Sequence, residues 1–132
     1  MATVTLNDKN LDSYVDKEGI VLLDFWAAWC GPCRAFAPVF EAASEAHKDI
    51  VFGKIDTEAE ESLAQSFQIR AIPTLMVFRD GIIVLSHSGA LPREALDEII
   101  EQVKKLDMNE VKKKIAEQEA NEPSKEDFER DD

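Results

Sequence analysis

The sequence predicts a one-domain α/β protein, because segments with strand patterns alternate along the chain with segments in which apolar residues recur at helical spacing. Ile20–Trp26 is an almost continuous apolar run, typical of a central strand covered on both faces. Asp80 and Gly81 separate two strand patterns and are a strong signal for a two-residue hairpin turn. A chain of 132 residues can bury roughly two-thirds of its unfolded surface in one core.

The first half of the chain supplies two strands and two helices. Val4–Leu6 is expected to form a short strand, and Asn7 suits the N-cap of a helix that carries Leu11, Tyr14 and Val15. After the apolar run comes a long amphipathic helix, whose apolar stripe consists of Phe36, Val39, Phe40, Ala43 and Ala46.

The second half supplies three strands and two helices. We expect a strand at Val51–Asp56 and a short helix at Ser62–Phe67. The hairpin joins strands Thr74–Arg79 and Ile82–Ser88. Pro92 stands near the start of a final amphipathic helix, whose apolar stripe consists of Leu96, Ile99, Ile100 and Val103.

The two cysteines of the chain, Cys30 and Cys33, enclose a Gly-Pro pair where the apolar strand gives way to the long helix. Thiols at this spacing can close a disulfide with little backbone movement, which indicates a two-electron redox function. A zinc site is one alternative, but it needs four ligands and only His47 and His87 could complete it. Two inert buried cysteines are another, which Gly-Pro disfavours because it is typical of an exposed turn.

The helix that follows the pair indicates how a thiol could become reactive. Cys30 is expected at or just before the first turn, where unpaired N–H groups and the helix dipole favour negative charge. This position should lower the pKa of the Cys30 thiol, and the thiolate is the form that attacks disulfides. Cys33 lies one turn further on and is expected to be more enclosed.

Asp24 is the one acid in the apolar strand. Strand alternation places it on the same face as Leu22 and Trp26, where apolar side chains belong. A lone buried carboxylate normally raises its pKa and takes up a proton. We interpret Asp24 as a proton relay that takes and returns the proton of Cys33. The alternative is a buried ion pair with Lys54 on the next strand, and the two roles are compatible.

Several separate motifs resemble those of the thioredoxin family. They lie between about Val4 and Leu106, and they are Asp24-Phe25-Trp26-Ala27-Ala28-Trp29-Cys30-Gly31-Pro32-Cys33-Arg34, Ala37-Pro38, Arg70-Ala71-Ile72-Pro73-Thr74, Gly81 and Gly89-Ala90-Leu91. The resemblance implies the thioredoxin fold, a mixed five-stranded central sheet flanked by four helices, in residues 1–106. Residues 107–132 would form a charged, acidic C-terminal extension that is part helical, with a disordered end.

The resemblance also implies a mechanism. Cys30 would attack a disulfide of a target protein as the nucleophile, and Cys33 would resolve the mixed disulfide, which leaves Cys30 and Cys33 joined as a redox-active disulfide. In the family, thioredoxin reductase, an NADPH-dependent flavoprotein, restores the dithiol. The electrons would therefore arrive in trans, with no bound cofactor and no metal, and the sequence has no nucleotide-binding motif. Such a protein-disulfide reductase and electron carrier would serve cell redox homeostasis.

The substrate-binding residues follow from the same resemblance. Pro73 resembles the family's cis-proline, which leaves the Ile72 backbone free to pair with an extended substrate segment. Local sequence alone favours an ordinary turn proline. Around the thiols we expect an exposed apolar platform, a kind of patch that usually marks a contact site, made of Trp29, Gly31, Pro32, Ile72, Pro73, Gly89 and Ala90. Trp26 is expected to pack beneath the motif.

Two other functions use the same fold. A disulfide oxidase or isomerase would work at another redox poise, but Gly-Pro between the cysteines accompanies the reducing members of the superfamily. A non-catalytic interaction subunit would leave the thiols incidental, but such modules often lose a cysteine. Here both cysteines remain, together with Asp24 and Pro73.

Charge and composition narrow the cellular setting. The net charge of −12 disfavours binding to nucleic acid or to anionic membranes. No apolar run approaches the length of a membrane span, and the first residues lack the basic and apolar regions of a signal peptide. We expect a monomeric cytoplasmic protein, in a compartment that keeps thiols reduced.

Residues 107–132 hold ten acidic and five basic residues, a net charge of −5. Met108, Val111 and Ile115 could extend the final helix or form another turn or two, but a straight continuation would not bury both apolar stripes. Beyond Asn121-Glu122-Pro123-Ser124 the composition is typical of disorder. It favours a solvated tail that aids solubility, and the alternative is a docking segment for a dedicated partner.

Overall fold

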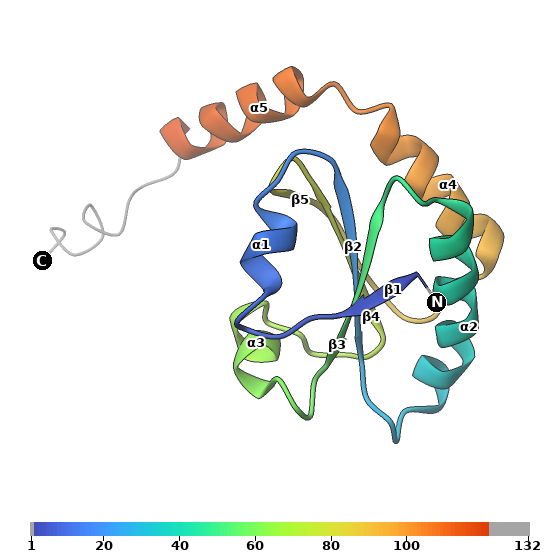
Figure 1. The fold of residues 1–132 in the computed structure, drawn as a ribbon. Coiled ribbons are helices and arrows are strands. Elements are labelled where there is room, and N and C mark those ends of the chain that lie inside the picture. Colours follow the sequence, from blue (N-terminus) through green and yellow to red (C-terminus); the bar gives the residue numbers. More distant parts are fainter. Residues whose placement is uncertain (1, 122–132) are drawn as a thin grey trace, which may run out of the picture.

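The computed structural model describes residues 2–121, which form five strands and five helices (Figure 1). The strands are β1 (Thr3–Thr5), β2 (Ile20–Trp26), β3 (Val51–Asp56), β4 (Thr74–Arg79) and β5 (Ile82–Ser88). The helices are α1 (Leu11–Val15), α2 (Gly31–Ala46), α3 (Glu61–Ser66), α4 (Arg93–Lys104) and α5 (Met108–Asn121). Within this range no helix has both the length and the apolar composition that crossing a membrane requires.

The five strands form one mixed sheet in the order β1-β3-β2-β4-β5, which confirms the predicted fold class. β1 and β2 run parallel to β3, whereas β4 runs antiparallel to both β2 and β5. The central place of β2 follows from its sequence, since its five inner residues are all buried and apolar side chains dominate both of its faces.

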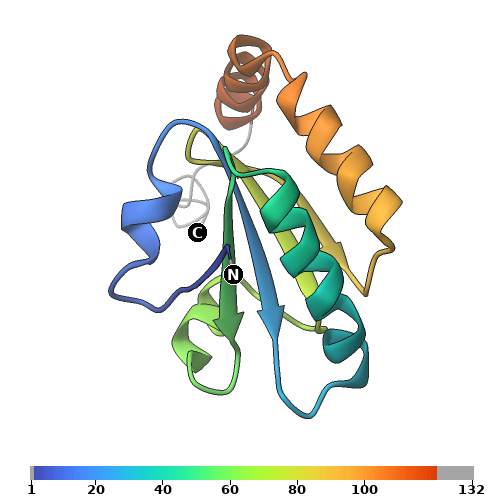
Figure 2. The same cartoon turned by 45° about the vertical axis from the view of Figure 1, so that its right-hand side comes forward.

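Helices cover both faces of the sheet: α2 and α4 lie on one side, and α1 and α3 on the other (Figure 2). Alternate residues of β2 enter two separate cores. Leu22 packs on the side of α2 and α4, where Phe40 meets Phe52 with ring centroids 5.2 Å apart. Leu23 packs on the side of α1. Asp24 alternates with Leu23 and therefore faces α2, as the sequence predicts.

The hairpin between β4 and β5 forms where the sequence predicts it. Asp80 and Gly81 have φ angles of 54° and 81°, the positive values that a two-residue turn of this type requires. The turn is also tied to the start of β2. The backbone N–H of Asp80 donates to the carbonyl of Gly19 at 2.9 Å, and the Asp80 carboxylate accepts from the N–H of Gly19 at 2.8 Å.

The predicted N-cap of the first helix is wrong. Asn10 occupies that position, without a side-chain capping bond. The side chain of Asn7 instead accepts from the backbone N–H groups of Lys9 and Asn10, at 2.9 and 3.0 Å. These bonds form a turn that precedes the helix, and α1 begins only at Leu11. Asparagine satisfies backbone donors in turns as readily as at N-caps, so its identity alone does not locate the helix start.

The C-terminal extension begins with a helix of its own. α4 ends at Lys104 and α5 starts at Met108, which is only 9% exposed. Arg79 Nη1 donates to the carbonyl of Val103 at 2.5 Å and lies 3.4 Å from the carbonyl of Leu106, so it satisfies groups that the end of a helix leaves unpaired. The break allows Met108 to be buried, which a straight continuation of α4 would not. The expected disordered end falls outside the described residues from position 122 on.

Candidate functional site

The two cysteines lie where β2 gives way to α2, as predicted. Cys30 is the N-cap of α2, with an extended backbone, and its Sγ accepts from the backbone N–H of Cys33 at 3.1 Å. A sulfur in this place faces one of the N–H groups that the first turn of a helix leaves unpaired. Negative charge on Cys30 would thus be stabilised by this hydrogen bond and by the helix dipole.

Cys30 and Cys33 are joined in a disulfide, with Cα atoms 5.2 Å apart, a usual separation for this bond. Both residues are buried, at 4% and 3% exposure. The expectation that Cys33 is the more enclosed of the two is therefore not visible in the exposure of the residues. They pack with Ala27, and Trp26 and Ile72 lie against this group, so Trp26 packs beneath the motif as predicted.

The two histidines lie on other elements. His47 is the C-cap of α2, at the far end of that helix from the cysteines, and its Nε2 lies 3.1 Å from a carboxylate oxygen of Asp97 on α4. Arg93 Nε donates to the same carboxylate at 3.1 Å. Within residues 2–121, no three side chains of the metal-binding types lie together. The contact of His47 with Asp97 links α2 to α4.

Asp24 is 0% exposed, and neither of its carboxylate oxygens has a hydrogen-bond partner among residues 2–121. Burial raises the pKa of Asp24 from its ordinary 3.8 to about 7, and the positive charge of Lys54 opposes part of the shift. Lys54 faces Asp24 in the register of β2 and β3, but its ammonium lies 5.2 Å from the centre of the Trp26 ring. The site therefore holds a carboxyl group that can gain or lose a proton near neutral pH.

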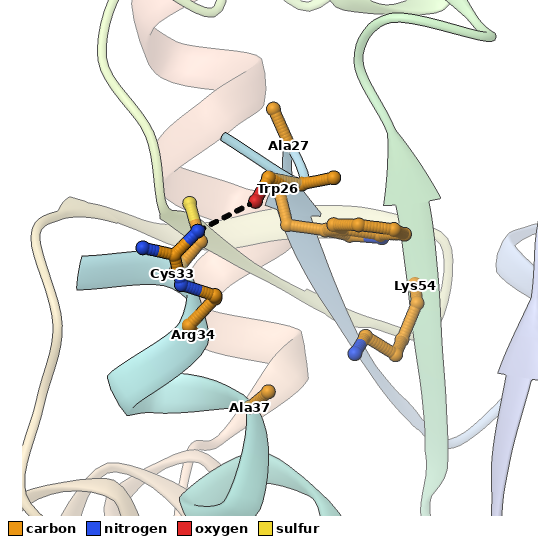
Figure 3. Close-up of a pocket in the computed structure, with 7 residues that line it drawn as sticks. Trp26, Ala27, Cys33, Arg34, Ala37 and Lys54 are labelled. Atoms are coloured by element: carbon orange, nitrogen blue, oxygen red, sulfur yellow. Dashed lines mark hydrogen bonds between the residues drawn. The ribbon is translucent and has the colours of Figure 1, made fainter. Parts of the chain in front are cut away.

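A pocket of about 110 Å³ adjoins Cys33. Figure 3 shows its walls: Cys33, Arg34 and Ala37 come from α2, Trp26 is the last residue of β2, and Lys54 lies within β3. Trp26 Nε1 is buried with no hydrogen-bond partner in the described part of the chain. A space of this size is large enough for a water molecule.

The surface around the disulfide is less uniformly exposed than predicted. Trp29 is 67% exposed and dominates it. The remaining members divide into three groups: Gly31, Pro32 and Ala90 are exposed, Ile72 and Gly89 are half-buried, and Pro73 is buried. The expected exposed platform is thus wrong for Pro73, whose carbonyl accepts from the N–H of Gly89 at 2.8 Å and which lies at the base of the patch. The Ile72–Pro73 peptide bond is cis, which local sequence did not predict.

Ile72 lies directly beside Cys30, since its carbonyl oxygen is 3.7 Å from Cys30 Sγ. A second pocket of about 200 Å³ runs from Ile72 to Trp29, and its remaining lining residues are Thr57, Ala64, Ile69, Arg70 and Ala71. An extended peptide in this pocket would lie next to Cys30. The arrangement can therefore hold a peptide segment close to Cys30 Sγ.

Sequence reasoning missed Glu58, whose Oε1 accepts from Trp29 Nε1 at 2.6 Å. The signal was available in the strand order. β2 and β3 are parallel and end in register at Trp26 and Asp56, so the residues that follow each strand meet at the same edge of the sheet. Glu58 follows β3 at that edge and fixes the position of the Trp29 ring.

The chain is similar to known proteins along most of its length. The family model described as Thioredoxin matches residues 2–102. A protein named thioredoxin 2 in Streptomyces coelicolor is 54% identical over 119 residues, which cover 90% of this chain and 89% of that protein. The thioredoxin of Alicyclobacillus acidocaldarius is 42% identical over 97 residues, which cover 73% of this chain and 92% of that protein.

Solved structures show the same similarity. The thioredoxin of Malassezia sympodialis superposes with a TM-score of 0.70 at 32% identity, over 76% of this chain and 89% of that one. A thioredoxin variant from Halobacterium salinarum superposes with a TM-score of 0.72 at 35% identity, over 79% and 91% of the two chains. The 119-residue match to the Streptomyces protein is longer than residues 1–106, so it includes part of the extension.

Proposed function

We propose, from the premise that this chain belongs to the thioredoxin family of thiol–disulfide oxidoreductases, that Cys30 is the nucleophile and Cys33 the resolving thiol of a protein-disulfide reductase. The observation that carries this assignment is the position of Cys30 Sγ at the N-terminus of α2, where it accepts the N–H of Cys33. That bond favours the thiolate on Cys30, the form that attacks a disulfide.

The first step is attack by the Cys30 thiolate on one sulfur of a target disulfide. The target S–S bond breaks, a mixed disulfide forms, and the second target sulfur leaves as a thiolate that takes a proton from water. The surface of Trp29, Gly31, Pro32, Ile72, Pro73, Gly89 and Ala90 would hold the target segment during this step. Exposed members would contact the segment, and buried Pro73 would position the backbone of Ile72 beneath it.

The second step is attack by Cys33 on Cys30. Cys33 must lose its proton first, and Asp24 is the acceptor that we assign. Its pKa of about 7 makes it able to take the proton and to return it when the disulfide is reduced again. Lys54 would stabilise the ionised form of Asp24 through its charge. The step releases the target as a dithiol and leaves Cys30–Cys33 oxidised, so two electrons have passed to the target.

The dithiol must then be regenerated by a partner. We assign this role to thioredoxin reductase, an NADPH-dependent flavoprotein, so that the chain itself holds no cofactor or metal. The expected setting is the cytoplasm, where a monomeric carrier would contribute to redox homeostasis without binding nucleic acid or membrane. Residues 1–106 would form the catalytic domain and residues 107–132 an extension, whose first helix is packed through Met108.

Insulin reduction by dithiothreitol tests the activity. The wild type should accelerate insulin precipitation, and both Cys30→Ser and Cys33→Ser should reduce the rate to the background. The two variants are matched controls for one another, because only Cys33→Ser should accumulate a mixed disulfide with insulin. Equal trapping by both variants, or activity retained without Cys30, would exclude the assignment.

Two further measurements separate the alternatives. A reduction potential close to those of oxidases would favour a disulfide oxidase or isomerase over a reductase. For the relay, thiol alkylation of Asp24→Asn is measured across pH. An alkylation profile and a turnover number both equal to those of the wild type would exclude a proton-transfer role for Asp24.

A further inference from the structure

The pocket beside Cys33 has in its wall Lys54, the residue that pairs with Asp24 across β2 and β3. It has a volume of about 110 Å³. Trp26 also lines it, and both Trp26 Nε1 and the two carboxylate oxygens of Asp24 are buried with no hydrogen-bond partner among residues 2–121. The pocket is large enough to admit water, and Arg34 and Lys54 bring polar groups to its largely apolar wall.

Arg34 spans this pocket. It stands on the first turn of α2, and its Nη1 donates to the carbonyl oxygen of Ala28, in the loop after β2, at 3.0 Å. Both residues line the pocket, and Figure 3 shows the Arg34 side chain reaching from the helix along this bond. In the described part of the chain its guanidinium forms no ion pair. Its one hydrogen bond therefore links the two walls of the pocket.

We propose that Arg34 is a positioning residue for the proton relay, because its bond to Ala28 keeps the pocket narrow and limits the water that reaches Asp24. This proposal rests on the proposed function of Asp24. Burial is the main reason that Asp24 holds a proton near neutral pH. By controlling the hydration of Asp24, the hydrogen bond between Arg34 and Ala28 therefore sets the pH range in which Asp24 can exchange a proton with Cys33.

The charge of Arg34 alone would act in the opposite direction. A cation near a carboxyl group lowers its pKa, so loss of that charge would raise the pKa of Asp24. Loss of the hydrogen bond between Arg34 and Ala28 admits water, which stabilises the carboxylate of Asp24 and lowers its pKa. The other groups around Asp24 stay unchanged in the oxidised protein: Lys54 on β3 carries a charge, Cys33 on α2 is held in the disulfide and does not titrate, and Leu75 opposite on β4 is apolar. The direction of the shift therefore distinguishes the two effects.

The experiment is an NMR titration of the Asp24 carboxyl in the oxidised protein, in which the cysteines do not titrate. Arg34→Ala and Arg34→Lys should both lower the pKa of Asp24, by roughly half a unit or more, since neither side chain can bridge to Ala28 as the longer guanidinium does. Ala37→Leu, which fills the same pocket from α2, should raise it. A rise or no change in the pKa of Asp24 in Arg34→Ala would overturn the proposal.

Hydrogen exchange of the Trp26 indole N–H gives a second readout, which a merely structural role of Arg34 would not move selectively. Exchange should become faster in Arg34→Ala and slower in Ala37→Leu. The indole of Trp29, outside the pocket, serves as the internal reference and should not change. Unchanged exchange at Trp26 would overturn the proposal. If Ala37→Leu fails to fold, the two Arg34 variants decide. Neither readout uses a substrate, so failure of insulin reduction would count against the proposed function only.

Discussion

Replacing Asp24 by Asn should remove a pH dependence from the stability of the oxidised protein. Asp24 is fully buried and its oxygens have no hydrogen-bond partner within residues 2–121, so the folded protein strongly prefers the protonated carboxyl. The unfolded chain has no such preference. Between the two pKa values, the folded state therefore binds a proton that the unfolded state releases.

The size of the effect follows from the two pKa values. The pKa of Asp24 is about 7 in the folded protein and 3.8 in an unperturbed chain. One pKa unit corresponds to about 1.4 kcal/mol, so the free energy of unfolding should fall by about 4 kcal/mol between pH 4 and 7 because of this group. The fall stops above pH 7, where both states are ionised. An asparagine of similar shape does not titrate, so its contribution is the same at every pH.

The assay is urea unfolding of oxidised wild type and Asp24→Asn at a series of pH values from about 4 to 8. The stability of the variant minus that of the wild type should rise across this range and then level off. Asp97→Asn is the matched control, because its carboxyl group is partly exposed and its pKa shift has the opposite sign. A flat difference for Asp24→Asn, or one that falls as pH rises, would refute the reasoning.

Three other substitutions probe packing, capping and charge. Gly53→Ala should destabilise the protein by roughly 1–3 kcal/mol, because a Cβ there would collide with Leu6 and lie 3.2 Å from Leu23 Cδ2. Gly31→Ala is the control, since a Cβ at that position would meet nothing within 4 Å. Equal urea-unfolding midpoints for the two variants would contradict the packing argument. Arg79→Leu should cost about 1–2 kcal/mol in urea unfolding, because the carbonyls of Val103 and Leu106 lose their donor; an unchanged midpoint would show that water replaces it fully. Partial burial raises the pKa of Asp97, but hydrogen bonds and charge from His47 and Arg93 lower it more, so its contribution is present above pH 4 and is lost as pH falls below that value. Asp97→Asn should therefore lower stability near neutral pH by no more than about 1 kcal/mol, and by less in acid; a larger loss in acid would contradict the assignment.

The elements of the fold were predictable because each depends on local patterns. The apolar run of β2 and the turn at Asp80 and Gly81 are confirmed within a residue. The start of α1 was not predictable from Asn7, since that side chain can cap a helix or close a turn with the same hydrogen bonds.

In the candidate site, too, some features were predictable from local sequence and others were not. The disulfide between Cys30 and Cys33 and the burial of Asp24 follow from short spacing and strand alternation. The burial of Pro73 and the bond between Glu58 and Trp29 depend on residues far apart in the sequence. Arg34 was visible only as part of a motif, and its bond to Ala28 emerged with the pocket.

The amino-acid order alone established the redox chemistry, because two thiols in one helical turn need no distant residue to form a bond. Tertiary structure decided how that chemistry is controlled. Desolvation of Asp24, the pocket beside Cys33 and the exposure of the residues around Trp29 all depend on which segments pack together. Burial and solvent access are properties of the assembled layers, and no local pattern encodes them.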